Sequence, residues 1–499
     1  MPAQLTTRAQ VNGYRFLLRR LDHALVRRDV RMLHDPMRSQ LRSLMVGAVL
    51  GVLVVAGAAI MAFLRPQGAI GDAKIVMGKD SGALYVFYTD KQTKETRLHP
   101  VLNLASARLI SGSAENPTSV KDSKLTSQPR GALLGIPGAP AALPGTAQSD
   151  RSDWTLCDTA ELSITGSAAA STGVRTTVLA TEPELSDRIR AFTREEAVLA
   201  KRGDKTYLLY DGKRAEVDPN DSVIARALGL IGLRPRPVST GLLDAAVPVQ
   251  PLTLPTVPEA GRPGPGKLSE VPVGGIVSVA GVGRDAASTL YVVLADGVQR
   301  IGDFTAEVLR TANSQGMREI KDVPPDVLTG MPVLHSLPLD HFPAVAPRIL
   351  RADDSPVTCL NWSKQHTSDA GEVDGEAGRA TLTFFAGTRL PLPDSAAPVP
   401  LATADGVGDR IDAAYLRPGS GEYLQTTGTA PGSPRLGSLF YVAENGIRYG
   451  VPDAATGELL GLGKKPRPAP WGIVGQLVPG PTLSKQEALV AHDALPTGF

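Results

Sequence analysis

The stretch LMVGAVLGVLVVAGAAIMAFL, Leu44–Leu64, contains 21 residues and no charged side chain. As an α-helix it would extend about 31 Å, close to the ~30 Å hydrocarbon core of a bilayer. No other segment of the chain has an apolar run of this length. A cleaved signal peptide is the alternative, because Ala56-Gly57-Ala58 could suit a signal peptidase. The run is longer than the usual apolar region of a signal peptide, and 43 residues precede it, so we predict a single transmembrane helix.

Charge differs between the two sides of this span. Residues 1–43 hold nine arginines, three aspartates and no lysine, a net charge of +6. The whole chain carries +2, so the remainder carries −4. Positive charge is retained on the cytoplasmic side of membrane spans, which predicts a cytoplasmic N-terminus and places the part after Arg65 across the membrane. The nearly neutral total charge gives no indication of nucleic-acid binding.

The arm before the span, residues 1–43, is predicted to form a basic amphipathic helix. Thr7 and Gln10 have the spacing of a capping box, and Asp35-Pro36 ends the helical pattern. Apolar residues recur at helical spacing in one stripe: Val11, Tyr14, Leu18, Leu21 and Leu25. Such a helix can lie on anionic phospholipid, or its stripe can seat on the cytoplasmic domain of a partner protein. Both alternatives stay open, and the docking residues we name are Tyr14, Leu18, Leu21, Leu25, Arg19 and Arg20.

Beyond the span, one pattern occurs in four copies. Each copy is a β-rich run that ends in a turn signal: Gly82–Asp90, Lys205–Gly212, Leu290–Gly297 and Leu439–Gly446. Asp-Gly and Asn-Gly favour the positive φ angles of a two-residue hairpin turn. A second strand and a helix-like segment follow each turn: Asn103–Ile110, Asp221–Leu230, Thr305–Thr311 and Ala454–Leu460. A hairpin with one helix buries little by itself, so we predict four small modules that pack together; chance similarity among ordinary hairpins is the alternative.

The chain has only two cysteines, Cys157 and Cys359. In an oxidising compartment they most simply form one disulfide, with two free buried thiols as the alternative. Such a bond would close a loop of about 200 residues, worth on the order of 5 kcal/mol in the chain-entropy model. It would also build one central domain, with units one and two flanking its first half and units three and four its second.

The predicted fold class is therefore a single-pass membrane protein with an α+β periplasmic part. Proline-rich stretches at Pro129–Pro144, Pro235–Pro272 and Pro391–Pro400 are interpreted as extended spacers. Ser484 to Glu487 has the spacing of a capping box for a short final helix. The predicted division is 1–43 cytoplasmic helix, 44–64 transmembrane helix, 70–145 repeat one, 150–200 first half of the central domain, 201–260 repeat two, 271–343 repeat three, 345–432 second half of the central domain, and 435–499 repeat four with the C-terminal helix.

Several strings together resemble the EccB family, the single-pass membrane component of mycobacterial ESX (type VII) secretion systems. They are Gly13–Arg20 (GYRFLLRR), Gly82–Val86, Leu102–Ile110, Gly135–Pro140, the sequences around both cysteines, and Gly480–Ser484. The resemblance spans essentially the whole chain and implies four periplasmic repeats around a central domain. It also implies an inner-membrane (plasma-membrane) core complex, self-association, and four partners: the motor ATPase EccC, the multispanning EccD, EccE and the mycosin protease.

The family also carries an ATPase label, which this sequence supports poorly. The nearest match to a phosphate-binding loop has Gly261, Gly266 and Lys267 at the right spacing. Leu268 stands where a hydroxyl should face magnesium, and Pro263 and Pro265 have no N–H to donate to phosphate. We interpret the stretch as a linker and predict no cofactor, with ATP expected only if the label holds.

Other catalytic and metal patterns are weak. The histidines form no HExxH pair, and no GxSxG elbow occurs. The acidic stretch 369–376, near His366, lacks the calcium-loop pattern, so a solvated loop is the better interpretation. The sequence thus predicts no catalytic residue and no metal site. The leading hypothesis is an assembly subunit of a secretion complex; an ATP-hydrolysing subunit and, more weakly, a cell-wall-binding module are the alternatives.

Overall fold

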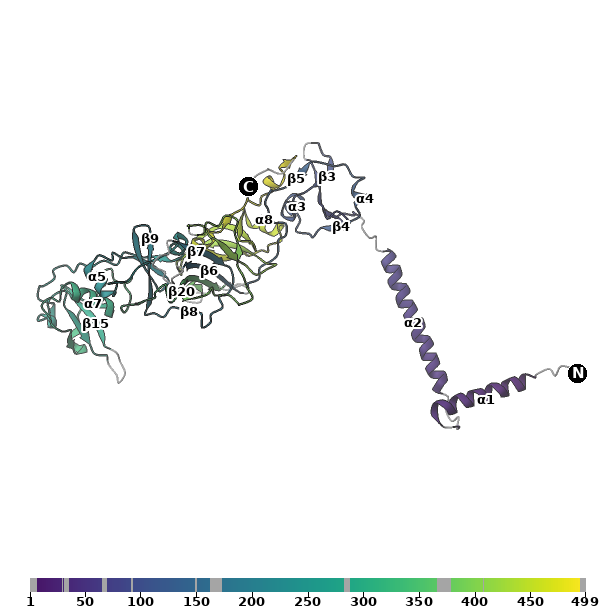
Figure 1. The fold of residues 1–499 in the computed structure, drawn as a ribbon, viewed down its shortest axis with the longest axis horizontal. Coiled ribbons are helices and arrows are strands. Elements are labelled where there is room, and N and C mark those ends of the chain that lie inside the picture. Colours follow the sequence, from purple (N-terminus) through teal and green to yellow (C-terminus); the bar gives the residue numbers. More distant parts are fainter. Residues whose placement is uncertain are drawn as a thin grey trace. The chain divides into compact units, whose positions relative to one another are not determined.

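The computed structural model describes residues 7–28, 30, 36–64, 70–90, 93–148, 150–161, 173–281, 288–365, 378–406 and 408–493. The chain forms two units, Met1–Gly71 and Asp72–Phe499. Figure 1 shows the helices of the first unit in purple and the mixed helices and strands of the second unit in blue to yellow.

The described part of the first unit consists of helices α1 (Arg8–Arg27) and α2 (Pro36–Leu64). The predicted capping box is present, because the Thr7 N–H donates to Gln10 Oε1 at 3.0 Å. α2 contains the predicted span and starts earlier, at a proline that suits the first turn of a helix. Its segment Gln40–Met61 is long and apolar enough to cross a membrane, and none of it is buried within the protein. A helix that is apolar all round and uncovered has the surface of a membrane span.

A seven-stranded sheet, here the central sheet, forms the middle of the second unit. In spatial order its strands are β21 (Val399–Pro400), β22 (Ala413–Tyr415), β7 (Val174–Leu179), β6 (Arg151–Ala160), β19 (Val357–Gln365), β20 (Thr381–Gly387) and β8 (Ile189–Ala191). β6 and β19 pair antiparallel along nearly their whole lengths, from Arg151 opposite Gln365 to Thr159 opposite Val357. Two stretches that are distant in sequence therefore form one sheet.

Besides the central sheet, the described residues form four sheets of four to six strands and one two-stranded sheet. The first contains β1 (Ile75–Gly78), β2 (Leu84–Thr89), β3 (Thr96–Pro100) and β4 (Thr118–Val120), with α3 (Leu104–Ser111) and α4 (Asp122–Leu125). The second contains β9 (Glu196–Arg202), β10 (Lys205–Tyr210), β11 (Lys213–Glu216), β12 (Arg236–Pro237), β13 (Val247–Pro248) and β18 (Arg348–Ile349), with α5 (Ser222–Ala227) and α6 (Thr240–Ala245).

The third small sheet contains β14 (Ile276–Val279), β15 (Thr289–Leu294), β16 (Gly297–Ile301) and β17 (Lys321–Val323), with α7 (Asp303–Ala312) and the 3-10 turns η2 (Gly266–Leu268) and η3 (Pro325–Leu328). The fourth contains β23 (Gly421–Thr427), β24 (Leu436–Ala443), β25 (Ile447–Val451), β26 (Arg467–Pro470) and β27 (Val478–Pro479), with α8 (Ala454–Leu459) and α9 (Trp471–Val474). Near the C-terminus, α10 (Lys485–Ala488) precedes β28 (Ala491–His492), which pairs with β5 (Leu133–Leu134) beside the first sheet.

The predicted helix-like segments are all helices, and local capping explains where several begin. Asn103 accepts from the Ser106 N–H, Asp221 from the Val223 and Ile224 N–H groups, and Asp453 from the Thr456 N–H. Ser484 caps the predicted final helix by accepting from the Glu487 N–H. These side chains satisfy amide groups that have no partner within the first turn of a helix.

The four modules pack together in two pairs. One hydrophobic cluster contains Val86 and Leu109 of the first module together with Tyr441 and Leu460 of the fourth. Another joins the second module to Phe304 and Val308 of α7, in the third. Figure 1 shows the same neighbours, with α3 beside α8 and α5 beside α7. The first module therefore packs on the fourth and the second on the third.

Two predicted boundaries are wrong because each cuts a sheet. β9 begins at Glu196, before the predicted start of repeat two at 201, and pairs with β10. β23 lies within the stretch assigned to the central domain, 345–432, yet pairs with β24 of the fourth sheet. Both are the first strands of their sheets, and the turn signals used for the prediction mark only the hairpin that follows.

The spacer interpretation is also wrong for the first two proline-rich stretches. Leu134, Ile136 and Leu143 are buried in the cluster shared by the first and fourth modules. The stretch Pro235–Pro272 contains β12, α6, β13 and η2. Proline is compatible with short edge strands and turns, so these segments fold against the sheets instead of separating them.

The hairpin turns follow the Asp-Gly prediction only once. Asp211 and Gly212 both have positive φ, 44° and 69°, as a two-residue turn of this type requires. At Asp296-Gly297, neither residue is among those with positive φ. A side chain at Gly297 would place its Cβ 2.3 Å from the Pro332 carbonyl oxygen, so close backbone approach explains this glycine.

Candidate functional site

The predicted disulfide between Cys157 and Cys359 is present, on the longest strand pair of the central sheet. The two residues lie directly opposite each other on β6 and β19, with Cα atoms 4.0 Å apart. The sulfurs lie on the face that packs with Leu179 and Phe385. Because side chains alternate along a strand, Trp154 and Trp362, also directly opposite, belong to the cluster on the other face.

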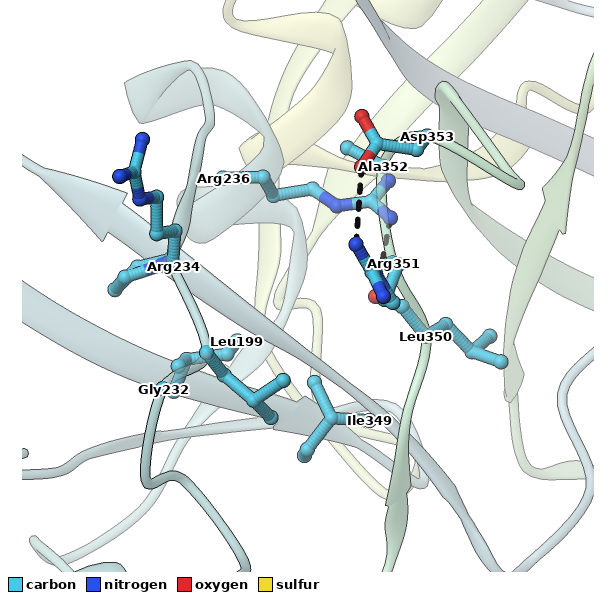
Figure 2. A pocket seen from close by; sticks show the side chains of 11 residues that line it. Leu199, Gly232, Arg234, Arg236, Ile349, Leu350, Arg351, Ala352 and Asp353 are labelled. Atoms are coloured by element: carbon cyan, nitrogen blue, oxygen red, sulfur yellow. Dashed lines mark hydrogen bonds and ion pairs between the residues drawn. The ribbon is translucent and has the colours of Figure 1, made fainter. Parts of the chain in front are cut away.

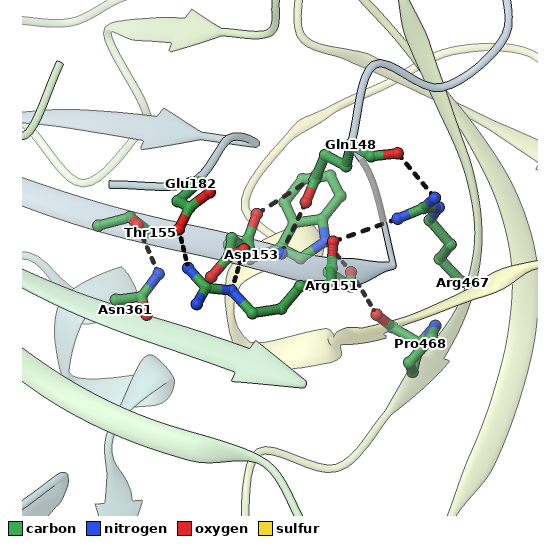
Figure 3. A network of polar contacts seen from close by, with 10 residues as sticks. Gln148, Arg151, Asp153, Thr155, Glu182, Asn361, Arg467 and Pro468 are labelled. Atoms are coloured by element: carbon green, nitrogen blue, oxygen red, sulfur yellow. Dashed lines mark hydrogen bonds and ion pairs between the residues drawn. The ribbon is translucent and has the colours of Figure 1, made fainter. Parts of the chain in front are cut away.

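A polar network joins this sheet to the fourth small sheet (Figure 3). Arg467 of β26 donates to the Gln148 carbonyl oxygen at 2.7 Å and to the Arg151 carbonyl oxygen at 3.2 Å. Ser152 Oγ donates to the Pro468 carbonyl oxygen at 2.8 Å. Arg151 in turn binds the buried Asp153 carboxylate at 2.8 Å. The contacts made by Arg467 and Ser152 span more than 300 residues of sequence, and no local pattern in the chain indicated them.

A second buried network surrounds Asp158, near the disulfide on β6. Its carboxylate accepts from the Ser239 N–H at 2.6 Å, Ser239 Oγ at 2.8 Å and Thr176 Oγ1 at 2.9 Å. Burial raises the pKa of this carboxyl to about 6, although the three hydrogen bonds favour its charged form. Ser239 also caps α6, so one carboxylate ties the central sheet to a helix of the second module.

A cluster of charged side chains, separate from the two polar networks above, holds the start of β9. Glu196 accepts from both terminal nitrogens of Arg190, at 2.7 and 2.8 Å, and also pairs with Arg348 of β18. The Arg190 hydrogen bond holds the pKa of the Glu196 carboxyl down, to about 2. The cluster thus connects the central sheet, which contains Arg190, with the second module.

The predicted docking residues lie on α1, where the structure shows them uncovered. Tyr14, Leu18, Leu21 and Leu25 are 64%, 44%, 59% and 74% exposed, and Arg19 and Arg20 are exposed as well. From Val11 the stripe advances by alternating steps of three and four residues, the spacing of a helix that packs along a second helix. The four apolar residues therefore share one exposed face of α1, and Arg19 and Arg20 lie outside that face.

The loop that resembles a phosphate-binding loop is folded in a way that does not fit a nucleotide. Lys267 Nζ donates to the carboxylate and to the carbonyl oxygen of Asp326, both at 2.9 Å. The Gly264 N–H donates to the Val271 carbonyl and the Leu268 N–H to the Pro265 carbonyl, at 2.9 and 3.0 Å. The amide groups of Gly261, Gly264 and Leu268, which a phosphate-binding loop would turn toward phosphate, are therefore already bonded.

An exposed aromatic cluster lies on the fourth module and was missed from the sequence. Trp471 is 48% exposed and stacks on Phe440 with ring centroids 5.9 Å apart. The Arg448 guanidinium lies 5.1 Å from the Trp471 ring centroid and 5.5 Å from that of Phe440. A hollow of about 680 Å³ is lined by Trp471 together with Arg214, Asp244 and Gln476. The pairing of β24 with β25 brings Phe440 and Arg448 together. Trp471 lies on α9, and only the tertiary structure places it beside them.

In the part of the chain that the structure describes, no three His, Cys, Asp or Glu side chains lie close enough together to hold a metal ion. The acidic stretch near His366 lies outside the described residues.

Comparisons with known proteins find the same family over nearly the whole chain. The profile of the family described as "Type VII secretion system ESX-1, transport TM domain B", EccB, matches residues 3–497. The chain is 39% identical to a Mycolicibacterium smegmatis protein named "ESX-3 secretion system ATPase EccB3", over 98% of this chain and 92% of that protein.

Two solved structures have the same fold. One is a chain in the periplasmic assembly of the ESX-5 inner membrane complex, with a TM-score of 0.67, 32% identity and coverage of 87% of this chain and 100% of that one. The other is the EccB3 dimer of the ESX-3 core complex, with a TM-score of 0.69, 35% identity and coverage of 84% and 100%. On this evidence of sequence and fold, the chain belongs to the EccB family of type VII secretion systems.

Proposed function

We propose that this protein is an assembly subunit of the inner-membrane core complex of a type VII (ESX) secretion system, and that Asp72–Phe499 builds part of its periplasmic assembly. The observation that carries the proposal is the match between 87% of this chain and every residue of a chain in the ESX-5 periplasmic assembly. The +6 charge of residues 1–43 supports a cytoplasmic N-terminus. A reporter fused after residue 70 should be active only in the periplasm, and cytoplasmic activity there would contradict this orientation.

We further infer that the four small sheets are copies of one module. In each sheet three successive strands pair antiparallel, a helix follows the third, and a fourth strand returns parallel to the first: β4 on β1, β12 on β9, β17 on β14 and β26 on β23. A further short helix or 3-10 turn then leads to a parallel contact with the third strand: Arg130 with Leu98, Val247 with Lys213, Val333 with Val298, and Val478 with Ile447. This shared order is more specific than the hairpin pattern from which repeats were predicted.

The arm and the periplasmic modules serve different contacts in this proposal. Self-association is supported by the related EccB3 dimer. The stripe on α1 is the docking surface for a cytoplasmic partner, and EccC, EccD, EccE and the mycosin protease are the partners that the family resemblance suggests. The arginines of α1 add attraction to anionic phospholipid at the same membrane face.

The test of the proposal is assembly of the complex in membranes. Leu18 and Leu21 are 44% and 59% exposed, so covering what remains of both surfaces is worth roughly 1.5–3 kcal/mol. The double variant Leu18→Asp, Leu21→Asp should therefore release the subunit from the high-mass complex on native electrophoresis, while insertion through α2 is unchanged.

The matched control is Ala9→Asp with Phe16→Asp, which adds the same charge on the opposite face of α1 and should assemble normally. Full assembly of the Leu18, Leu21 variant would show that the arm is only a membrane-surface helix. Absence of the unaltered protein from any high-mass complex would contradict the assembly role itself.

ATP hydrolysis is the second candidate function, favoured only by the name of the relatives. The bonded loop around Lys267 argues against it. Purified full-length protein that hydrolyses ATP, and loses the activity in Lys267→Ala, would overturn our preference.

Binding of a cell-wall polymer is a weaker third candidate. The hollow beside Trp471 combines an exposed aromatic ring with polar side chains. Peptidoglycan should then retain the purified protein, and Trp471→Ala should abolish retention; no retention of the unaltered protein excludes this function.

A further inference from the structure

A cavity of about 350 Å³ lies where two distant segments meet the outer edge of the second small sheet. β18 pairs with β9 at Glu196–Ala197, and β12 pairs with β9 at Ala200–Lys201, both in parallel. Leu199 lies between these two pairings and lines the cavity, whose walls are residues 232–236 and 349–353. The cavity thus results from the junction of the second module with the segment that leads back to the central sheet.

Positive charge dominates this cavity. Its lining contains three guanidinium groups, those of Arg234, Arg236 and Arg351, and one carboxylate, that of Asp353, which leaves a net of two positive charges. Figure 2 shows Arg236 and Arg351 pointing toward Asp353 from opposite walls, with Arg234 on the same wall as Arg236 and its guanidinium turned away from that group. Arg351 pairs with Asp353 at 3.3 Å and remains 65% exposed on its side chain.

Arg236 is the structural centre of the cavity. It is only 5% exposed, and its hydrogen bonds go to neutral acceptors: the Ser355 and Leu350 carbonyl oxygens at 2.8 and 3.2 Å, and Thr358 Oγ1 at 2.6 Å. Burial lowers the pKa of this guanidinium to about 10, which still leaves it charged at neutral pH. Its hydrogen-bond partners are neutral, and the carboxylates of Asp158 and Asp353 attract it only through space, so it keeps part of its attraction for an anion.

Arg234 adds an exposed donor group at the rim. Its side chain is exposed, and its guanidinium makes no hydrogen bond or ion pair with any residue in the described ranges. We propose that this cavity binds a small polyanion that carries phosphate or carboxylate groups, with Arg236 as its fixed positive charge and with Arg234 and Arg351 closing on the ligand. A guanidinium can bind either group through two parallel hydrogen bonds, which is why both chemistries share one site.

The test is calorimetric titration of the detergent-solubilised full-length protein at low ionic strength, with pyrophosphate and with citrate as probes. We expect saturable binding of at least one probe, weakened as salt is added. Arg234→Gln with Arg351→Gln should weaken that binding by about tenfold or more, because two charged donors are lost. The affinity of the Arg234→Lys, Arg351→Lys variant should lie between those of the unaltered protein and the glutamine variant, because lysine keeps the charge but loses the forked geometry of the guanidinium.

The matched control is Arg226→Gln with Arg410→Gln, which removes the same charge from two exposed arginines outside the cavity lining. It should bind within about twofold of the unaltered protein. Binding of pyrophosphate alone assigns the site to phosphate groups, citrate alone to carboxylates, and both to their common charge. The proposal is overturned if neither probe binds at millimolar concentration, if the glutamine variant binds as well as the unaltered protein, or if the control loses as much affinity.

Discussion

Removal of the disulfide should destabilise the central sheet far more than its local contacts would suggest. Cys157 and Cys359 are 202 residues apart in sequence, and the loop they close contains the second and third modules. In the chain-entropy model, opening a loop of this length stabilises the unfolded state by about 5 kcal/mol. Replacing both cysteines by alanine should therefore cost about this much free energy of unfolding.

Tryptophan fluorescence during guanidinium denaturation reports on this region, because Trp154 and Trp362 are both 1% exposed and lie on the same two strands as the bond. With a denaturant dependence of about 2–6 kcal/mol/M, the midpoint should fall by about 1–2.5 M. The matched control is the unaltered protein treated with a reductant, whose unfolding midpoint should fall to that of the variant. The midpoint of the variant should not change when the reductant is added. A shift below about 0.3 M would refute the reasoning, since pairing of β6 with β19 would then close the loop without the bond.

Three further predictions concern single side chains. The pKa of Asp158 is raised to about 6, so its contribution to stability is present below pH 3.8 and is lost as pH rises through 6; the unfolding midpoint should fall over this range, and Asp158→Asn should remove the dependence. Glu196→Gln should cost about 1.5–3 kcal/mol of unfolding free energy at pH 7, because its charge-assisted bonds are weakened. The Glu196 carboxyl, with a pKa held near 2, gives stability that is present above pH 4.5 and lost as pH falls through 2, so unaltered and variant proteins should converge in acid. Lys267→Ala should leave secretion unchanged and shift the unfolding midpoint little, because its ion pair with Asp326 is exposed; lost secretion with intact folding would reopen the nucleotide-site hypothesis.

Local features of the sequence determined the parts of this protein that depend on a short stretch of chain. A charge-free run of 21 residues predicts a span from length alone. Asparagine, aspartate or serine at helix starts predicts α3, α5, α8 and α10, since a cap acts within one turn. The disulfide was predictable because only one pair of cysteines exists.

Only the tertiary structure decided which modules meet and what chemistry their junctions contain. The first strands β9 and β23 have no turn signal of their own and are assigned by the strands with which they pair. Arg236 and Arg351 lie 115 positions apart, and Arg467 bonds to a carbonyl more than 300 residues away. Charge and hydrogen-bond complementarity act through space, so residues with no pattern along the chain become neighbours only after the sheets have packed.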